Sequence, residues 1–413
     1  MGRSQIGPMA ISRRALIRAG ASLGALTLAA GIALPAAAQD GPIRLGVLSD
    51  MSGMVVDLSG PGTVEAVEMA VEDFGGEVLG RPIEVLVGDH LNKPDVGIGL
   101  ARKWYDEGVG AIFDVGITSV ALGVQDLARQ RDKIVMFISS ATADLTGKAC
   151  SPNGIHWNYN SNSQAVGVIR SFIEEGHKSF YFLTVDYAYG HTVQADTTKM
   201  IEALGGTVVG ATPHSFETTD FSSDLLKAQS SGADVIALAT TSVHIPNIIK
   251  QADEFGVRPG QSVAPLSLTL HDVKAMGLPT AQGVLETSTF YWDQNDETRA
   301  FAERFRERFG RMPNMVQASG YGAAKHYLEA IAAAGTDETQ AVLAKMHETP
   351  VNDFMTKGAR IRPDGQVMRE QIILRVKTPD ASTGEWDLYE VIGSVPAEEA
   401  YLPPNPDVCP IAG

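Results

Sequence analysis

Short apolar runs alternate with amphipathic segments along most of the chain. The apolar runs predict strands at 43–48, 82–89, 110–115, 133–138, 179–185, 206–212, 234–240, 262–267 and 283–287. The segments between them repeat apolar residues at helical spacing and predict helices at 63–74, 96–107, 120–131, 163–176, 190–204, 222–231 and 245–255. This alternation is typical of α/β proteins with mostly parallel sheets and helices on both faces.

The alternation restarts near HWNYN (156–160), which divides it into two α/β units. Further elements follow both units: the pattern predicts helices at 297–309, 317–334 and 338–347 and strands at 370–376 and 386–392. Because these elements come after two complete units, we expect the chain to pass between the units more than once.

The first 38 residues have the features of an export signal. SRRALIR (12–18) contains a pair of arginines, a stretch rich in Ala, Leu and Gly follows at 19–34, and small residues at 36–38 precede Gln39. This order is typical of a twin-arginine signal peptide that is cleaved after export. The alternative is a membrane anchor, but the apolar stretch is short for a bilayer span. No later segment is long and apolar enough to span, so we expect no direct membrane insertion after cleavage.

Composition and charge limit the possible partners. The chain has 413 residues, of which 44% are apolar and 20% charged, so it can bury a normal globular core. Its formal net charge is −16, and removal of residues 1–38 would take away four arginines and no acid, giving −20. Such an acidic chain argues against nucleic acid or an anionic membrane surface as a partner.

Enzyme and metal-site motifs are almost absent. The pattern G-x-S-x-G occurs once, at 20–24, inside the predicted signal. Zinc-protease, C-x-x-C, P-loop and G-x-G-x-x-G patterns do not occur, and the nine histidines lack metal-site spacing. We therefore predict that the protein is not an enzyme and uses no metal or cofactor. An exported α/β enzyme remains the alternative, because many twin-arginine cargoes carry redox cofactors.

Three predicted strands of the first unit, 43–48, 110–115 and 133–138, end in loops of small and hydroxyl-bearing residues. The carboxyl ends of parallel strands gather at one edge of a sheet, where ligands bind. Hydroxyls, open backbone N–H groups and helix N-termini at this edge can bind a carboxylate without a cationic side chain. For each Ser or Thr taken alone, a helix cap is the alternative. The candidates in these loops are Ser52, Thr118, Ser119, Ser140, Ala141 and Thr142.

The second unit supplies aromatic residues at the corresponding edge. DYAYG (186–190) follows the predicted strand 179–185 and contains Tyr189, which can present a ring face and a hydroxyl. Tyr159 lies at the junction of the two units. The alternative for each is an aromatic residue that packs at the rim or in the core.

The chain contains, in order, the segments DMSG (50–53), GPGTVEAVEMAVEDFGG (60–76), LGRPIEVLVGDHLNKPDVG (79–97), SSATADLTGKACSPN (139–153), DYAYG (186–190), IKQADEFGV (249–257), TFYWDQNDETRAF (289–301) and CP (409–410). In this combination they resemble bacterial periplasmic solute-binding proteins of ABC importers. The resemblance is to the leucine/isoleucine/valine-binding-protein-like group, which includes binders of aromatic acids such as benzoate and hydroxycinnamate derivatives.

The resemblance implies a type I periplasmic-binding fold, in which two doubly wound α/β lobes are joined by a three-segment hinge and close on the ligand by rotation. It implies that lobe one comprises 39–158 and 288–350, that lobe two comprises 159–287 and 351–396, and that the tail 397–413 returns to lobe one. It also implies a periplasmic protein that delivers a small carboxylate to a membrane permease; a sensor subunit with the same fold is the alternative.

The resemblance also assigns roles to the candidates. The side chains of Ser140 and Thr142 and the backbone of Ala141 would hold the ligand carboxylate. Thr118 and Ser119 would hold its other side, near Ser52, and Tyr189 would close over it from lobe two.

The chain departs from amino-acid-binding relatives where the ligand tail would lie. PLSLTLHD (265–272) offers Ser267 but no acid before Asp272, Tyr159 is followed by Asn160, and TTSVH (240–244) places Thr241 at a turn. Without an acidic partner for an amine, an aromatic or keto acid is favoured. A branched-chain or other amino acid remains the alternative.

The two cysteines of the chain are Cys150 and Cys409. Relatives have a cysteine in the TG-x-x-C segment and another near the C-terminus, so the resemblance implies that these two pair. An exported protein can keep a disulfide. Two free thiols are the alternative.

Overall fold

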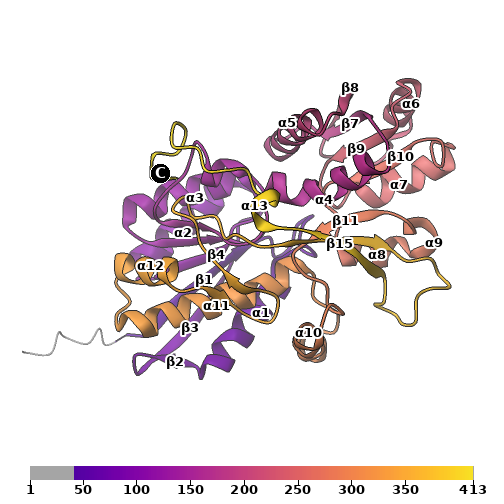
Figure 1. Cartoon of the computed structure of the whole chain (residues 1–413). Coiled ribbons are helices and arrows are strands. Elements are labelled where there is room, and N and C mark those ends of the chain that lie inside the picture. The colour runs from indigo at the N-terminus through magenta and orange to yellow at the C-terminus, as the bar shows by residue number, and fades with distance from the viewer. Residues whose placement is uncertain (1–40, 413) are drawn as a thin grey trace, which may run out of the picture. The chain divides into compact units, whose positions relative to one another are not determined.

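The computed structural model describes residues 41–412. The predicted signal peptide, residues 1–38, lies outside the described residues. Contacts join the chain from Gly41 onward into a single unit. Within that unit, Figure 1 shows the early strands β1, β3 and β4 grouped apart from the later strands β7, β8, β9 and β10.

The first sheet has six strands in the order β2-β3-β1-β4-β5-β6. Its strands are β1 (Ile43–Ser49), β2 (Glu77–Val78), β3 (Arg81–Asp89), β4 (Ala111–Asp114), β5 (Ile134–Phe137) and β6 (Gly154–His156), and its helices are α1 (Gly60–Phe74), α2 (Pro94–Asp106) and α3 (Thr118–Arg131). Every pair is parallel except β2 with β3. The strand order reverses between β1 and β4, where ligands bind in open α/β sheets.

The second sheet has four parallel strands in the order β10-β9-β7-β8. Its strands are β7 (Ser179–Val185), β8 (Thr207–His214), β9 (Val235–Ala239) and β10 (Ser262–Pro265). Its helices are α4 (Ser161–Glu174), α5 (Ala188–Ala203), α6 (Ser222–Ser230), α7 (Ile245–Glu254), α8 (Leu270–Met276) and α9 (Leu278–Ala281). The prediction of two mostly parallel α/β units is confirmed.

The late part of the chain adds a three-stranded antiparallel sheet, a two-stranded sheet and four α-helices. The three-stranded sheet consists of β11 (Leu285–Ser288), β14 (Gln371–Val376) and β15 (Tyr389–Val395), in that order. The remaining elements are α10 (Asp296–Phe309), α11 (Met315–Ala334), α12 (Thr339–Glu348), β12 (Val351–Asn352), β13 (Lys357–Ala359), α13 (Ala397–Ala400) and the short 3₁₀ helices η1 (Ala143–Thr146) and η2 (Pro410–Ala412). In the described part of the chain, no helix is long and apolar enough to cross a membrane.

Helix α11 packs along α1, so the chain returns to the first sheet after β11. The segment that follows α12 also lies on this side: Lys325 of α11 donates to the carbonyl of Asn352 (3.2 Å), and the His156 N–H donates to the carbonyl of Gly365 (2.9 Å). These contacts favour a last passage between the sheets near Arg369 rather than near residue 350. The division into lobes remains a proposal.

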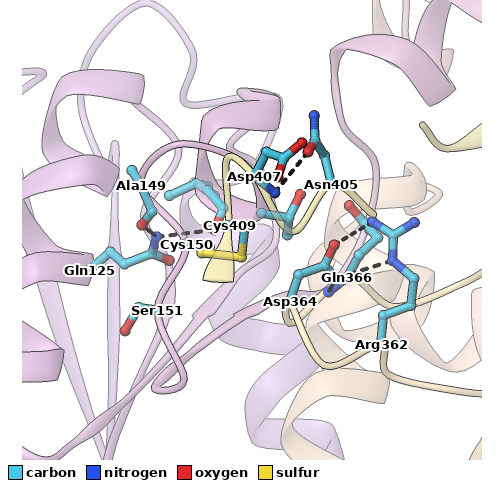
Figure 2. Close-up of a disulfide and its surroundings, with 12 residues drawn as sticks. Gln125, Ala149, Cys150, Ser151, Arg362, Asp364, Gln366, Asn405, Asp407 and Cys409 are labelled. Atoms are coloured by element: carbon cyan, nitrogen blue, oxygen red, sulfur yellow. Dashed lines mark hydrogen bonds and ion pairs between the residues drawn. A yellow bond between two sulfur atoms is a disulfide. The ribbon is translucent and has the colours of Figure 1, made fainter. Parts of the chain in front are cut away.

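Cys150 and Cys409 form a disulfide, as predicted. Figure 2 shows this bond between the loop after η1 and the C-terminal tail. The tail also contacts the junction between the two parallel sheets, because the buried Tyr401 hydroxyl donates to the carbonyl of Asn158 (3.0 Å). The tail therefore connects β15 with the first sheet.

Candidate ligand-binding site

A cavity of about 370 Å³ lies between the carboxyl ends of the two parallel sheets. The first sheet contributes residues from the loops after β1, β3, β4 and β5. The second contributes residues from the loops after β7, β8, β9 and β10. Such a cavity at the switch points of two α/β sheets is a typical place for a small ligand.

The loops after β4 and β5 make one end of the cavity. Gly116 and Thr118 line it where α3 begins, and Ser139 and Ala141 line it after β5. The first N–H groups of a helix have no partner within the helix and carry partial positive charge. This end can therefore hold a carboxylate without a cationic side chain.

A buried acid lies beneath this end. Asp114 is the last residue of β4 and accepts a short hydrogen bond from the Ser139 hydroxyl. Burial raises the pKa of Asp114 to about 6, while hydrogen bonds from Ser139, Ser49 and Ser59 act in the opposite direction. Its backbone has a φ of 84°, in the left-handed region that only Gly adopts freely. This left-handed conformation turns the chain toward Gly116.

The other end of the cavity belongs to β1 and β3. Asp50 follows β1, and His90 and Asn92 follow β3. The Asp50 carboxylate accepts from the N–H groups of Gly53 (2.6 Å) and Val55 (2.9 Å) and from the Asn92 amide (3.0 Å). Asp50 thus holds the β1–α1 loop in place. Val55, Leu58 and Ser59 of this loop also line the cavity.

The second sheet presents mainly aromatic and hydroxyl groups. Tyr187 and Tyr189 follow β7, Phe216 follows β8, and Tyr159 comes from the junction between the sheets. Thr241 and Ser242 follow β9, and Ser267 follows β10. Among the described residues that line the cavity, none is a lysine or an arginine.

Tyr159, which is buried, and Tyr189, which is half-buried, hold the aromatic wall of the cavity in place. The Tyr159 hydroxyl donates to the carbonyl of Ser139 (3.1 Å), which joins the junction to the β5 loop. The Tyr189 hydroxyl accepts from the Gln164 amide (3.0 Å). Burial raises the pKa of both tyrosines, so both hydroxyls are neutral near pH 7.

Six of the ten predicted ligand-binding residues line the cavity. They are Thr118, Ala141, Tyr159, Tyr189, Thr241 and Ser267. The structure thus brings together candidates from both sheets and from the junction.

Two further candidates, Ser52 and Ser119, are not among the residues that line the cavity. The exposed Ser52 hydroxyl donates to Asp89 (2.6 Å), and Ser119 Oγ lies 3.2 Å from Tyr187 Oη, opposite it.

Ser140 and Thr142 flank Ala141 but are not among the lining residues. Both are buried. The Thr142 hydroxyl accepts from the Asp144 N–H (3.4 Å) as the cap of η1, and His156 Nε2 donates to the Ser140 carbonyl (2.7 Å). Burial lowers the pKa of His156 to about 4, so this neutral ring supports the loop.

Several lining residues were not predicted from the sequence: Asp50, Val55, Leu58, Ser59, His90, Asn92, Phe216 and Ser242. All of them follow carboxyl ends of parallel strands, so the rule that selected the β4 and β5 loops would also have found them. Among the described residues, no three His, Cys, Asp or Glu side chains are grouped as a metal site.

Known proteins resemble this chain over most of its length. The family described as periplasmic binding protein matches residues 42–384. A periplasmic binding protein from Burkholderia mallei is 36% identical, with a TM-score of 0.85, over 87% of this chain and 96% of its own. A branched chain amino acid ABC transporter periplasmic ligand-binding protein from Burkholderia xenovorans LB400 is 38% identical, with a TM-score of 0.80, over 87% and 97% of the two chains. Leu/Ile/Val-binding protein homolog 1 from Brucella melitensis is 24% identical over 72% of this chain and 81% of its own.

Proposed function

The chain belongs to the periplasmic binding protein family, and from this premise we propose that it is the substrate-binding subunit of an ABC importer. It captures a small carboxylate in the cavity between the sheets and presents it to a membrane permease. Family membership implies a periplasmic location, and export through a twin-arginine signal is part of the proposal.

The observation that carries this proposal is the uncharged donor set at the β4–β5 end of the cavity. Thr118 at the start of α3, together with Gly116 and Ala141, provides hydroxyl and backbone donors to a carboxylate. Hydrogen bonds to a charged group contribute about 1.5–3 kcal/mol each. A few of them can support binding at about micromolar affinity, which corresponds to roughly −8 kcal/mol.

For the ligand we propose an aromatic or keto acid without an amine. The second sheet lines the cavity with Tyr187, Tyr189 and Phe216 and with hydroxyls, and no acid comes from that side among the described lining residues. Asp50, on the first sheet, is already bonded to two backbone N–H groups and to Asn92. Among the described lining residues, an ammonium group would therefore find no carboxylate that is free of other hydrogen bonds.

The competing ligand class is the branched-chain amino acids. The name of the Burkholderia xenovorans relative, which is 38% identical, favours it. The two classes can be separated by a pair of ligands that differ only in the amine: leucine and its 2-keto acid, 4-methyl-2-oxopentanoate.

The test is calorimetric titration of the purified protein with leucine, 4-methyl-2-oxopentanoate, benzoate and 4-hydroxybenzoate. We expect binding of at least one acid that lacks an amine and none of leucine. Binding of leucine alone would overturn the ligand class, and binding of no acid at all would overturn the function. Thr118→Val should weaken acid binding about tenfold or more, whereas Thr192→Val, at a half-buried position of α5 that does not line the cavity, should leave it unchanged.

A further inference from the structure

Asp114 lies beneath the β4–β5 end of the cavity, and its side chain is fully buried, with 0% exposure. Two serines that line the cavity contact or approach its carboxyl group. The Ser139 hydroxyl donates to it, and the Ser59 hydroxyl lies close enough to stabilise a charge on it. Asp114 is therefore directly behind the wall of the cavity.

The surroundings of Asp114 supply no cation. The groups that stabilise a charge on its carboxyl group are the hydroxyls of Ser139, Ser49 and Ser59 and the Ser139 N–H, none of which is charged. Its Oδ2 atom is buried and has no hydrogen-bond partner among the described residues. A buried carboxylate with no cation and one unpaired oxygen is costly, so this position favours the protonated acid.

The titratable groups near Asp114 keep their charge state around pH 7. Tyr159 at the junction is neutral because burial raises its pKa, and Tyr327 of α11, whose ring packs against Phe113, is neutral for the same reason. His156 of β6 is neutral because burial lowers its pKa to about 4. Asp114 is therefore the member of this group that can change charge there.

Two titratable residues, Asp50 and His90, line the cavity at the β1–β3 end. The Asp50 carboxylate already accepts from two backbone N–H groups and from the Asn92 amide. Burial lowers the pKa of His90, although Asp50 and Asp89 act in the opposite direction, so its ring is mainly neutral above pH 6.5. Neither residue supplies a positive charge to the β4–β5 end in this range.

We propose that the cavity takes up one proton together with the ligand anion, and that Asp114 holds this proton. The inference rests on the proposed function, which places the ligand carboxylate at Gly116 and Thr118. Gly116 is two residues after Asp114, so their Cα atoms are at most about 7 Å apart. Two carboxylates at such a distance repel each other in a site that excludes water, and a proton on Asp114 removes the repulsion.

Protonation also changes what the Ser139 hydroxyl can do. An ionised Asp114 can only accept, so the hydroxyl hydrogen of Ser139 is committed to it. A neutral carboxyl group has a hydrogen of its own, which frees the hydrogen of Ser139 for another acceptor. Ser139 Oγ lies beside Gly116, since a Cβ built there would be 2.5 Å from it. The proton comes from bulk water, so neither the ligand nor another residue loses one.

The affinity for acids should therefore fall as the pH rises. Burial raises the pKa of Asp114 to about 6 in the free protein, and a bound anion raises this pKa further. Between the two pKa values binding takes up a proton, and the affinity falls by at most about tenfold per pH unit. Below the lower value Asp114 is already protonated, and the affinity no longer changes with its titration.

The test is calorimetric titration of the wild-type protein with benzoate and with 4-methyl-2-oxopentanoate at pH 6.5 and pH 8.5, where both ligands are ionised. For the acid that binds more tightly, we expect a Kd at least about threefold higher at pH 8.5. Titrations at pH 7 in phosphate and in Tris, which differ in ionisation enthalpy, should show net uptake of protons on binding. Equal Kd values with no proton uptake would overturn the inference and leave the proposed function intact. Absence of binding by both acids at both pH values would instead count against the proposed function.

Asp114→Asn tests which group takes up the proton. Asn has nearly the shape of a protonated Asp, and it tolerates the left-handed backbone at this position, where φ is 84°. The Kd of this variant should differ less than twofold between the two pH values, and binding should take up no proton.

Asp272→Asn is the matched control. Burial raises the pKa of Asp272 to about 6 as well, but this residue does not line the cavity, so the variant should keep the pH dependence of the wild type. A pH dependence that persists in Asp114→Asn would show that another group takes up the proton and would refute the assignment to Asp114. If Asp114→Asn does not fold, the proton uptake of the wild type still decides whether the ligand anion binds with a proton.

Discussion

Ser119 Oγ and Tyr187 Oη lie 3.2 Å apart, and their hydrogen bond connects the two parallel sheets across the cavity. Ser119 is in the first turn of α3, after β4, and Tyr187 immediately precedes α5, after β7. The bond exists only while the two carboxyl edges face each other closely. The bond therefore favours the closed state, in which the two carboxyl edges face each other across the cavity.

Removal of this bond should weaken ligand binding. A hydrogen bond of this kind contributes about 0.5–1.5 kcal/mol, so Ser119→Ala and Tyr187→Phe should each raise the Kd about two- to tenfold. The double variant should lose no more than the larger single effect, because both changes break the same bond. Calorimetric titration of the four proteins measures this coupling. Fully additive losses would show that the two residues act independently and would contradict the inference.

Loss of the disulfide should loosen the tail without abolishing the fold. Cys150 and Cys409 are 259 residues apart, and the entropy model gives roughly 5 kcal/mol for such a loop as an upper limit. Other contacts remain in the reduced protein: Gln125 of α3 donates to the carbonyls of Leu145 (3.1 Å) and Ala149, beside the disulfide in Figure 2. We expect a lower Tm after Cys409→Ser, with unchanged circular dichroism at 25 °C.

The matched control for this prediction is reduction of the wild type. Dithiothreitol should lower the Tm of the wild type to that of Cys409→Ser and should have no effect on the variant. Limited proteolysis should then cleave after residue 396 faster than in the oxidised protein. An unchanged Tm in both experiments would mean that the bond contributes nothing to stability.

The stability of the protein should depend on Glu286 as the pH rises. Glu286 in β11 is buried, and the Tyr389 hydroxyl donates to it. Burial raises the pKa of Glu286 to about 8 from its usual value of 4.5, with nearby Asp272 acting in the same direction. Between about pH 4.5 and 8 the native state therefore keeps a proton that the unfolded state has lost. The free energy of unfolding falls as the pH rises through this window, by at most about 1.4 kcal/mol per unit from this residue.

Glu286→Gln should remove this part of the pH dependence. Urea unfolding at pH 5 and pH 8 measures it: the variant should lose less stability than the wild type over the interval. Other buried acids, such as Asp114, titrate in both proteins and cancel in the comparison. The exposed Glu398→Gln is the control and should follow the wild type. Parallel stability curves for Glu286→Gln and the wild type would contradict the assignment.

The parallel sheets could be predicted from the sequence because their strands are buried on both faces and read as continuous apolar runs. Short elements gave no such signal: β6 has only three residues and depends on pairing with β5. The strand predicted at 386–392 begins instead at Tyr389, because Asp387 is held in the preceding loop by Lys377 and Thr383 (2.5 and 2.9 Å).

The position of the site could also be predicted, but not the orientation of each side chain. Neighbouring residues in a loop look alike in sequence, yet Ala141 lines the cavity while Thr142 caps η1. Asn160, which stands where an acid was expected, caps α4 with its side chain. His90 and Asn92 lie in DHLNK (89–93), which resembles an ordinary polar turn, and only the fold brings it to the cavity.

Acid binding at the β4–β5 end of the cavity should be sensitive to a single methyl group added at Gly116. A Cβ atom there would lie 2.5 Å from Ser139 Oγ, closer than side chains pack, so the Ser139 hydroxyl would have to leave its bond to Asp114. Gly116→Ala should therefore weaken acid binding at least tenfold and reduce stability by about 1–3 kcal/mol. Gly99→Ala is the matched control, because Gly99 lies in α2 with no heavy atom within 4 Å of an added Cβ and should become slightly more stable as Ala. If Gly116→Ala binds acids as tightly as Gly99→Ala does, the carboxylate is not held at the start of α3 and must bind to another part of the cavity.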